Sequence, residues 1–180
     1  MHDTPERTAD SRFRQQTPLD NERTPTMDDR PDTQRSERDD AAAAGIRRHI
    51  DRLIELLHAK DLDALALLYA EDVVSFDVEP PLQHVGRAAK MRNWAKAFGF
   101  FAELGYEVRE LDITVGDDVA FAHGFGRLSG TLADGSVAAG MWVRATFCLR
   151  RIDGEWLIVH DQASVPFDIR TGKGVTDLEP

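Results

Sequence analysis

The chain has 180 residues, a formal net charge of −10 and a single cysteine, Cys148. This length supports one hydrophobic core, and the excess of acids argues against a nucleic-acid partner. A lone cysteine excludes an internal disulfide, and no cysteine or histidine pair has the spacing of a zinc site.

Residues 1–44 differ in composition from the rest of the chain. They contain eleven acids and seven bases, which leaves 21 acids and 15 bases for residues 45–180. Apolar side chains are scarce as far as Asp40, so the segment cannot bury enough surface to offset the entropy lost on ordering. This composition predicts a disordered polar tail. Met27 is an alternative start, in which case the earlier residues are an upstream extension.

No segment has the pattern of a targeting or membrane element. The tail lacks the apolar run of a secretory signal, and nothing later approaches the roughly 20 consecutive apolar residues of a spanning helix. We therefore expect a soluble, cytoplasmic protein with no membrane partner.

Two helices are predicted at the start of the folded part. Apolar residues recur at helical spacing in the first helix: Ile46, Ile50, Leu53, Ile54 and Leu57. Asp61 has the position of an N-cap for a second helix, which carries Leu65, Leu68 and Tyr69. Because the junction between them is short, the two helices should pack as a hairpin.

A short strand and a third helix follow. Residues 73–78 form a mainly apolar run that includes Asp77, and Pro80-Pro81 stops the strand because proline cannot donate to a sheet. A third helix is predicted from Gly86 to about Phe101. Its apolar stripe consists of Met91, Trp94, Ala95 and Phe98, and its opposite, basic stripe of Arg87, Lys90 and Lys96.

From Tyr106 the pattern has a period of two and predicts four long strands in a meander. Turn residues separate them at 116–118, 133–136 and 153–154. Helices followed by consecutive strands predict an α+β fold, a cone in which a strongly curved antiparallel sheet wraps around three helices. The predicted domain spans residues 45–168, and a flexible C-terminal tail occupies 169–180.

Three segments stand out within this element order: YAEDVVSFDVEP, HVGRAAKM and IDGEWLIVHDQASVPF. With the element order, they resemble the nuclear transport factor 2-like superfamily, particularly its SnoaL-like and ketosteroid-isomerase-like branch. The resemblance covers residues 46–168. It implies a pocket for a small-molecule ligand, no cofactor and no metal. The fold hosts isomerases, cyclases, dehydratases, hydrolases and proteins that only bind, so it does not by itself select a function.

The resemblance also implies a role for Asp77. In ketosteroid isomerases the general base is an Asp eight positions after an aromatic residue, and Asp77 stands eight positions after Tyr69. Those enzymes also use a Tyr and a protonated Asp to stabilise the oxyanion. The matching positions here are Leu53 and Ala145, whose side chains cannot donate a hydrogen bond, which argues against steroid-type isomerisation.

Strand alternation predicts which side chains face the pocket. On the second long strand, bulky residues alternate with small ones, and we interpret the bulky set as inward: Val119, Phe121, His123, Phe125 and Arg127. The next strand contributes Val143, Ala145, Phe147 and Leu149. The family's inward frame selects His160, Gln162 and Ser164 on the last strand. Asp161 is then expected to point outward, toward Arg144 or Arg150. The outer face carries aromatic and charged residues and suits a homodimer partner.

The predicted site combines these side chains. The candidate catalytic residues are Asp77, His123 and His160, and the candidate substrate-binding residues are Tyr69, Trp94, Phe121, Phe125, Arg127, Phe147, Gln162 and Ser164. Simpler interpretations stay open: Asp77 pairing with Arg87, histidines bonded to backbone carbonyls, and Arg127 either at the rim or on a substrate carboxylate. A metal site at Asp77, His123 and His160 has suitable ligand types but no recognised spacing.

Three functions are compatible with this pattern. The first is an enzyme that isomerises, cyclises or dehydrates a small apolar carbonyl or hydroxy compound by general acid–base catalysis, with Asp77 as base. The second is a non-catalytic module for ligand binding or dimerisation. The third is a protein whose acidic tail contacts another macromolecule. Epoxide hydrolysis in this fold uses two acids flanking an Arg, and the prediction of a single inward acid argues against it.

Overall fold

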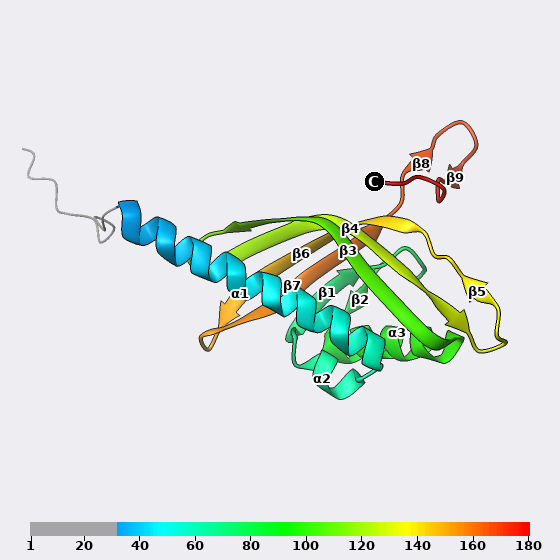
Figure 1. Cartoon of the computed structure of the whole chain (residues 1–180), viewed down its shortest axis with the longest axis horizontal. Coiled ribbons are helices and arrows are strands. Elements are labelled where there is room, and N and C mark those ends of the chain that lie inside the picture. Colours follow the sequence, from blue (N-terminus) through cyan, green and yellow to red (C-terminus); the bar gives the residue numbers. More distant parts are fainter. Residues whose placement is uncertain (1–31) are drawn as a thin grey trace, which may run out of the picture. The chain divides into compact units, whose positions relative to one another are not determined.

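The structure is a computed structural model that describes residues 32–180 (Figure 1). The predicted disorder of residues 1–31 and the alternative start at Met27 lie outside the described residues. Helix α1 runs from Asp32 to Ala59, so residues 32–44, assigned to the tail from composition, are helical. The run Ala41–Ala44 explains the extension because alanine is the strongest helix former. Arg38 also bonds Asp117, at 2.7 Å.

Helix α1 buries the stripe predicted for it, and Ile46, Ile50, Leu53 and Leu57 are all in the core. Helix α2, Leu62–Ala66, is capped by Asp61, whose carboxylate accepts from the Ala64 backbone N–H at 3.0 Å. It is shorter than predicted. Tyr69 belongs to strand β1, Tyr69–Phe76, because it pairs with Ile158 across the sheet.

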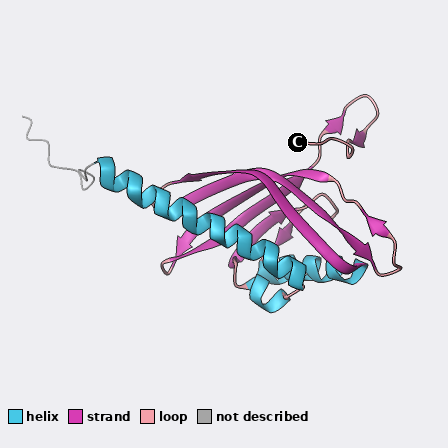
Figure 2. Ribbon diagram, viewed as in Figure 1, coloured by secondary structure: helices cyan, strands magenta, loops and turns pink. Residues whose placement is uncertain are grey.

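The remaining elements build one curved sheet. After the short strand β2 (His84–Val85) and helix α3 (Arg87–Phe100) come four long strands: β3 (Phe101–Val115), β4 (Val119–Leu132), β6 (Trp142–Ile152) and β7 (Glu155–Ser164). The sheet order is β2-β1-β7-β6-β4-β3, with the short β5 (Val137–Ala138) paired to β4. The α+β class and the long antiparallel run are confirmed, while β1 lies parallel to β7 and makes the sheet mixed. Helix α1 crosses one face of it (Figure 2).

The side chains of strand β4 lie on the opposite faces from those predicted. Ala120 and Ala122 are buried, whereas Phe121 and His123 are exposed. The inward set predicted from side-chain bulk is therefore wrong. In this part of β4 the small residues face the concave side. Gly126 shows how tight this side is, since a Cβ there would lie 2.7 Å from the Tyr106 hydroxyl.

Strand β7 contains an irregularity that changes which residues face inward. Cys148 pairs with His160, but the next residue, Leu149, pairs with Ile158, so one residue of β7 is bulged out. Ile158 and Asp161 are both buried as a result. The predicted inward position of His160 and outward position of Asp161 are therefore wrong. Strand β6 follows its prediction, with Ala145, Phe147 and Leu149 in the core.

The C-terminal segment predicted as a flexible tail contains a strand and contacts the sheet. Strands β8 (Phe167–Asp168) and β9 (Lys173–Gly174) pair as a small hairpin beyond the end of β7 (Figure 1). Farther on, Glu179 accepts a hydrogen bond from the indole N–H of Trp142 at 2.6 Å. No helix in the described range is long and apolar enough to cross a membrane.

Candidate active site

A cavity of about 690 Å³ opens on the concave face of the sheet. Its wall is mostly apolar and comes from helices α1 and α3 and strands β3, β4, β6 and β7, with Leu53, Trp94, Phe101, Leu128, Val143 and Phe147 among the contributors. Polar side chains gather at one place in this wall, around Asp77, Lys90 and Asp161. This composition is typical of a pocket for a small apolar molecule with one polar function.

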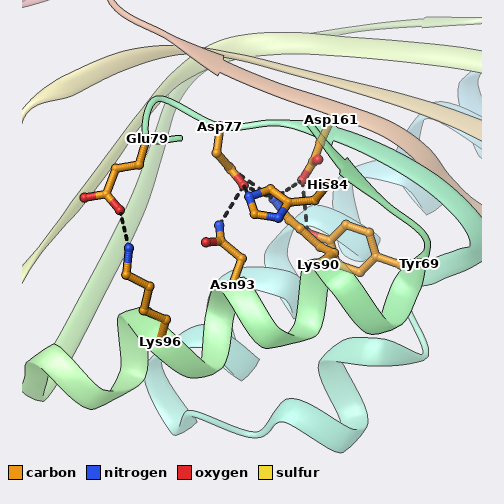
Figure 3. Close-up of polar contacts among 8 residues, drawn as sticks. All are labelled: Tyr69, Asp77, Glu79, His84, Lys90, Asn93, Lys96 and Asp161. Carbon is orange, nitrogen blue, oxygen red and sulfur yellow. Dashed lines mark hydrogen bonds and ion pairs between the residues drawn. The ribbon is translucent and has the colours of Figure 1, made fainter. Parts of the chain in front are cut away.

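Two carboxylates flank one ammonium group in the pocket (Figure 3). Lys90 rises from helix α3 and places its Nζ 3.3 Å from Asp77 Oδ1 and 3.0 Å from Asp161 Oδ2. Asp77 follows the end of β1, and Asp161 lies on the neighbouring strand β7. The parallel pairing of β1 with β7 and the bulge in β7 bring the two acids together.

Neighbouring side chains fix the orientation of both acids. The Asn93 amide, one turn after Lys90 on helix α3, donates to Asp77 Oδ2 at 2.7 Å. His84 Nε2 lies 3.5 Å from the same oxygen. On the other side, the Tyr69 hydroxyl donates to Asp161 Oδ2 at 3.3 Å. Within the described residues, Asp161 Oδ1 is buried and has no hydrogen-bond partner.

The environments of the two acids differ. Burial raises the pKa of Asp161 above its ordinary value, and the nearby charge of Asp77 raises it further. Lys90 and the Tyr69 hydroxyl oppose this shift, but burial has the larger effect. Asp161 therefore favours its neutral form more than an ordinary Asp does. Asp77 is less enclosed, with 20% of its side chain exposed.

The tyrosines beside the acids remain hydrogen-bond donors. Burial raises the pKa of Tyr69 and of Tyr106 well above the usual range, and the charge of Asp161 adds to both shifts. Both phenols are therefore neutral at physiological pH. The Lys90 Nζ also lies 5.3 Å from the centre of the Trp94 ring, so its charge faces an aromatic surface as well as the two carboxylates.

This geometry places two carboxyl groups of different burial beside one ammonium group in an apolar pocket. A buried carboxyl that holds its proton can act as a general acid, while a less buried carboxylate nearby acts as the base. Pairs of carboxyl groups in different environments perform these two roles in several enzyme classes. The arrangement can move protons to and from a small bound molecule.

Comparison with known proteins identifies the fold family. Residues 46–168 match the sequence profile of the SnoaL-like domain. The chain belongs to the SnoaL-like family. No curated protein matches it in sequence. An NTF2-like protein of unknown function from Pseudomonas putida KT2440 is 31% identical, with a TM-score of 0.70 over 78% of this chain and 97% of that one.

Two more distant structures share the SnoaL-like fold. An NTF2-like superfamily protein from Salmonella enterica serovar Typhimurium LT2 is 17% identical, with a TM-score of 0.66 over 76% of this chain and 99% of that one. An NTF2-like protein from Streptomyces avermitilis, named as a proposed dehydratase, is 18% identical, with a TM-score of 0.63 over 72% of this chain and 99% of that one. At these identities the likeness shows the fold.

The structure divides the predicted site residues between the two faces of the SnoaL-like sheet. Tyr69, Asp77, Trp94, Phe147 and Gln162 line the pocket. The others are not among the lining residues: Phe121, His123, Phe125, Arg127, His160 and Ser164. The three ligands of the alternative metal site are thus not brought together, and the described residues contain no other group of three acidic, His or Cys side chains placed to hold a metal.

Specific contacts decide between the alternative roles considered for His160, Arg127 and Arg87. His160 Nδ1 lies 2.7 Å from the Val74 carbonyl oxygen, in the backbone-bonded role considered for the histidines. Arg127 pairs with Glu107 at 2.5 Å. Arg87 pairs with Glu71 at 2.9 Å, so it is not the ion-pair partner of Asp77.

Sequence reasoning missed Lys90, Asn93, His84, Tyr106 and Asp161. A signal for Lys90 was present: it lies four residues before Trp94, which places both on one side of helix α3. Asn93 is one turn after Lys90 and belongs to the same group. Asp161 could not be found by strict alternation, because the bulge in β7 reverses the order of its faces.

Proposed function

We propose that this protein catalyses proton transfer on a small, neutral, largely apolar hydroxy or carbonyl compound, as a cofactor-independent isomerase, cyclase or dehydratase. The observation that carries the proposal is the arrangement of Asp77, Lys90 and Asp161, in which one ammonium group contacts two carboxyl groups of different burial. Asp77 is the base, and Asp161 is the acid.

A dehydration uses both groups in one step. Asp77 takes a proton from the carbon next to the substrate carbonyl, and the released electron pair forms a carbon–carbon double bond. The carbon–oxygen bond of the leaving hydroxyl breaks, and Asp161 gives that oxygen its proton, so water is released. Afterwards Asp77 carries the proton and Asp161 the charge, while Lys90 remains next to both.

An isomerisation uses the same groups differently. Asp77 takes a proton from one carbon and returns it to another, while protonated Asp161, oriented by the Tyr69 hydroxyl, donates a hydrogen bond to the oxygen on which negative charge develops. Asp161 then supplies a donor in place of those missing at Leu53 and Ala145. Donors fixed in a buried site can contribute about 10²- to 10³-fold to such a rate.

The charges of the pocket favour a neutral substrate. Both lysines that line it are already paired, Lys90 with the two acids and Lys96 with Glu79 at 3.0 Å. A substrate carboxylate would meet two acidic groups without a cation of its own. The carboxylate-binding role considered for Arg127 does not apply to this pocket, which Arg127 does not line.

A panel of cyclic β-hydroxyketones and β,γ-unsaturated ketones tests the proposal. Dehydration of the first class and isomerisation of the second both produce a conjugated enone, which ultraviolet absorbance detects. We expect the wild-type protein to convert at least one member, and Asp77→Asn and Asp161→Asn each to lose that activity. No conversion by the wild type across the panel, or full activity of Asp77→Asn, would contradict the proposal and favour a ligand-binding module.

Epoxide hydration is the second candidate because two pocket acids flank a cation. From the sequence, Asp77 is predicted to be the single inward acid, which argues against epoxide hydrolysis. The buried position of Asp161 beside Lys90 removes that objection. Lys90 would take the place of the Arg that two acids flank in the epoxide hydrolases of this fold. Incubation of cyclic epoxides in ¹⁸O-labelled water separates the two candidates, since only hydration gives a labelled diol.

We also propose that the convex face of the sheet forms a homodimer. Phe76 and Phe121 are 38% and 44% exposed there, and aromatic residues are enriched at such interfaces. Sedimentation equilibrium tests this. We expect a dimer for the wild type and a monomer for Phe121→Glu. A monomeric wild type at micromolar concentration would disprove it.

A further inference from the structure

The C-terminal segment, residues 165–180, contributes to the pocket although it extends beyond the family domain. The SnoaL-like match ends at residue 168, but Thr176 is one of the pocket-lining residues. The segment leaves β7, forms the β8–β9 hairpin and folds back, with the Val175 N–H donating to the Pro166 carbonyl at 2.7 Å. Beyond this turn the chain reaches the pocket at Thr176.

The end of the segment is fastened to the other face of the sheet. Glu179 Oε2 accepts from Trp142 Nε1 at 2.6 Å, a short hydrogen bond to a charged acceptor. Trp142 opens strand β6, next to Met141 and Val143 of the pocket wall. The segment therefore passes from the pocket at Thr176 to the convex face at Glu179, around the start of β6.

The indole of Trp142 is held in one orientation. Its ring lies 4.4 Å from the guanidinium carbon of Arg109 and 4.7 Å from that of Arg127. Glu107 pairs with both arginines, at 3.6 Å and 2.5 Å. Trp142 is only 6% exposed. In this enclosed position the ring directs its N–H at Glu179, and the nearby cations favour an anionic partner.

We propose that residues 165–180 form a latched wall of the pocket, closed by the Trp142–Glu179 hydrogen bond, which limits the release and size of ligands. This proposal rests on the proposed function in one respect, because it takes the same pocket as the ligand site. It does not depend on which chemistry Asp77 and Asp161 perform. Opening the wall requires Glu179 to leave Trp142, so the latch acts mainly on the rate of ligand release.

The probe for the test is N-phenyl-1-naphthylamine, a neutral aromatic molecule whose fluorescence rises in apolar surroundings. Stopped-flow dilution of the bound probe measures its release from the full-length protein. Glu179→Ala and Trp142→Phe should each release it about three- to tenfold faster. The double variant should match the faster single variant, because both changes break the same bond. Asp177→Asn, a neighbouring change of charge, should leave the rate unaltered.

A second measurement reports on the latch without a ligand. The chain has three tryptophans, so three indole N–H signals are expected in a ¹⁵N-labelled NMR spectrum. Trp142→Phe assigns one of them, and Glu179→Ala should move that signal while those of Trp94 and Trp156 stay in place. This measurement also shows whether each variant is folded.

Three results would overturn the latch: no fluorescence rise with the wild-type protein, an unchanged release rate in Glu179→Ala, or a double variant in which the two rate effects multiply. Each differs from a failure of the proposed chemistry, because the probe is bound and not converted. Loss of turnover in Asp77→Asn together with unaltered probe release in Glu179→Ala would reject the latch alone. Full turnover in Asp77→Asn together with faster probe release in Glu179→Ala would reject the chemistry alone.

Discussion

The two faces of the curved sheet carry different kinds of residue. On strand β4 the concave face holds Ala120, Ala122 and Gly126, and the convex face holds Phe121 and His123. The concave face is the one that borders the polar group of Asp77, Lys90 and Asp161. On β4, therefore, the face with the bulky residues is not the one that borders the pocket.

The largest contrast between the faces should be in catalysis. With a substrate identified, Asp77→Asn should lower kcat/KM by about 10²- to 10⁴-fold, the usual contribution of a general base. His123→Gln, on the convex face, should leave kcat/KM within about twofold, since it does not line the pocket. Steady-state kinetics of the two variants check this. Equal losses in both would remove the functional distinction between the faces.

Stability should separate two phenylalanines in the same way. Phe147 is 4% exposed and Phe121 is 44% exposed. Phe147→Ala should reduce the free energy of unfolding by about 3–5 kcal/mol because it leaves a cavity in the core. Phe121→Ala should change the unfolding free energy of the monomer by about 0.5 kcal/mol or less. Urea denaturation at low protein concentration measures both, and a reversed order would contradict the assigned faces.

A smaller effect is expected at the concave glycine that faces Tyr106. A Cβ at Gly126 would lie 2.7 Å from the Tyr106 hydroxyl, so Gly126→Ala should destabilise the protein by about 1–3 kcal/mol. Gly99 in helix α3 is the matched control, because a Cβ there meets nothing within 4 Å. Gly99→Ala should stabilise the protein by about 0.5–1 kcal/mol. A shift of the urea midpoint in the same direction for both substitutions would show that the space between position 126 and the Tyr106 hydroxyl is not crowded.

The sequence predicted the elements well and their faces less well. Helical spacing located α1 and α3, the period of two located the four long strands, and Asp77 was recognised at the end of a strand. Alternation divides a strand into two faces but does not say which face is concave. The prediction that the bulky residues of β4 lie on the concave face is therefore wrong. The bulge in β7 depends on pairing with Leu149 and exchanges the faces of His160 and Asp161, which no local pattern reveals.

The pH dependence of the site follows from the raised pKa of Asp161. A general acid works only while protonated, so activity should fall as the pH rises through the pKa of Asp161 in the folded protein, above its ordinary value of 3.8. In Asp161→Asn, any residual activity should lack this alkaline decline. Rates of the wild type and Asp161→Asn across the pH range check this alkaline decline. A decline at the same pH in both proteins would assign it to another group.

Titration of the Asp161 carboxyl carbon by ¹³C NMR shows whether burial raises the pKa of this group, and it needs no substrate. Asp161→Asn identifies the signal. We expect a midpoint above 3.8, because burial outweighs the attraction of Lys90 3.0 Å away. A midpoint at or below 3.8 would show that Asp161 is simply the ionised partner of Lys90, and the pocket would then hold no general acid at this position.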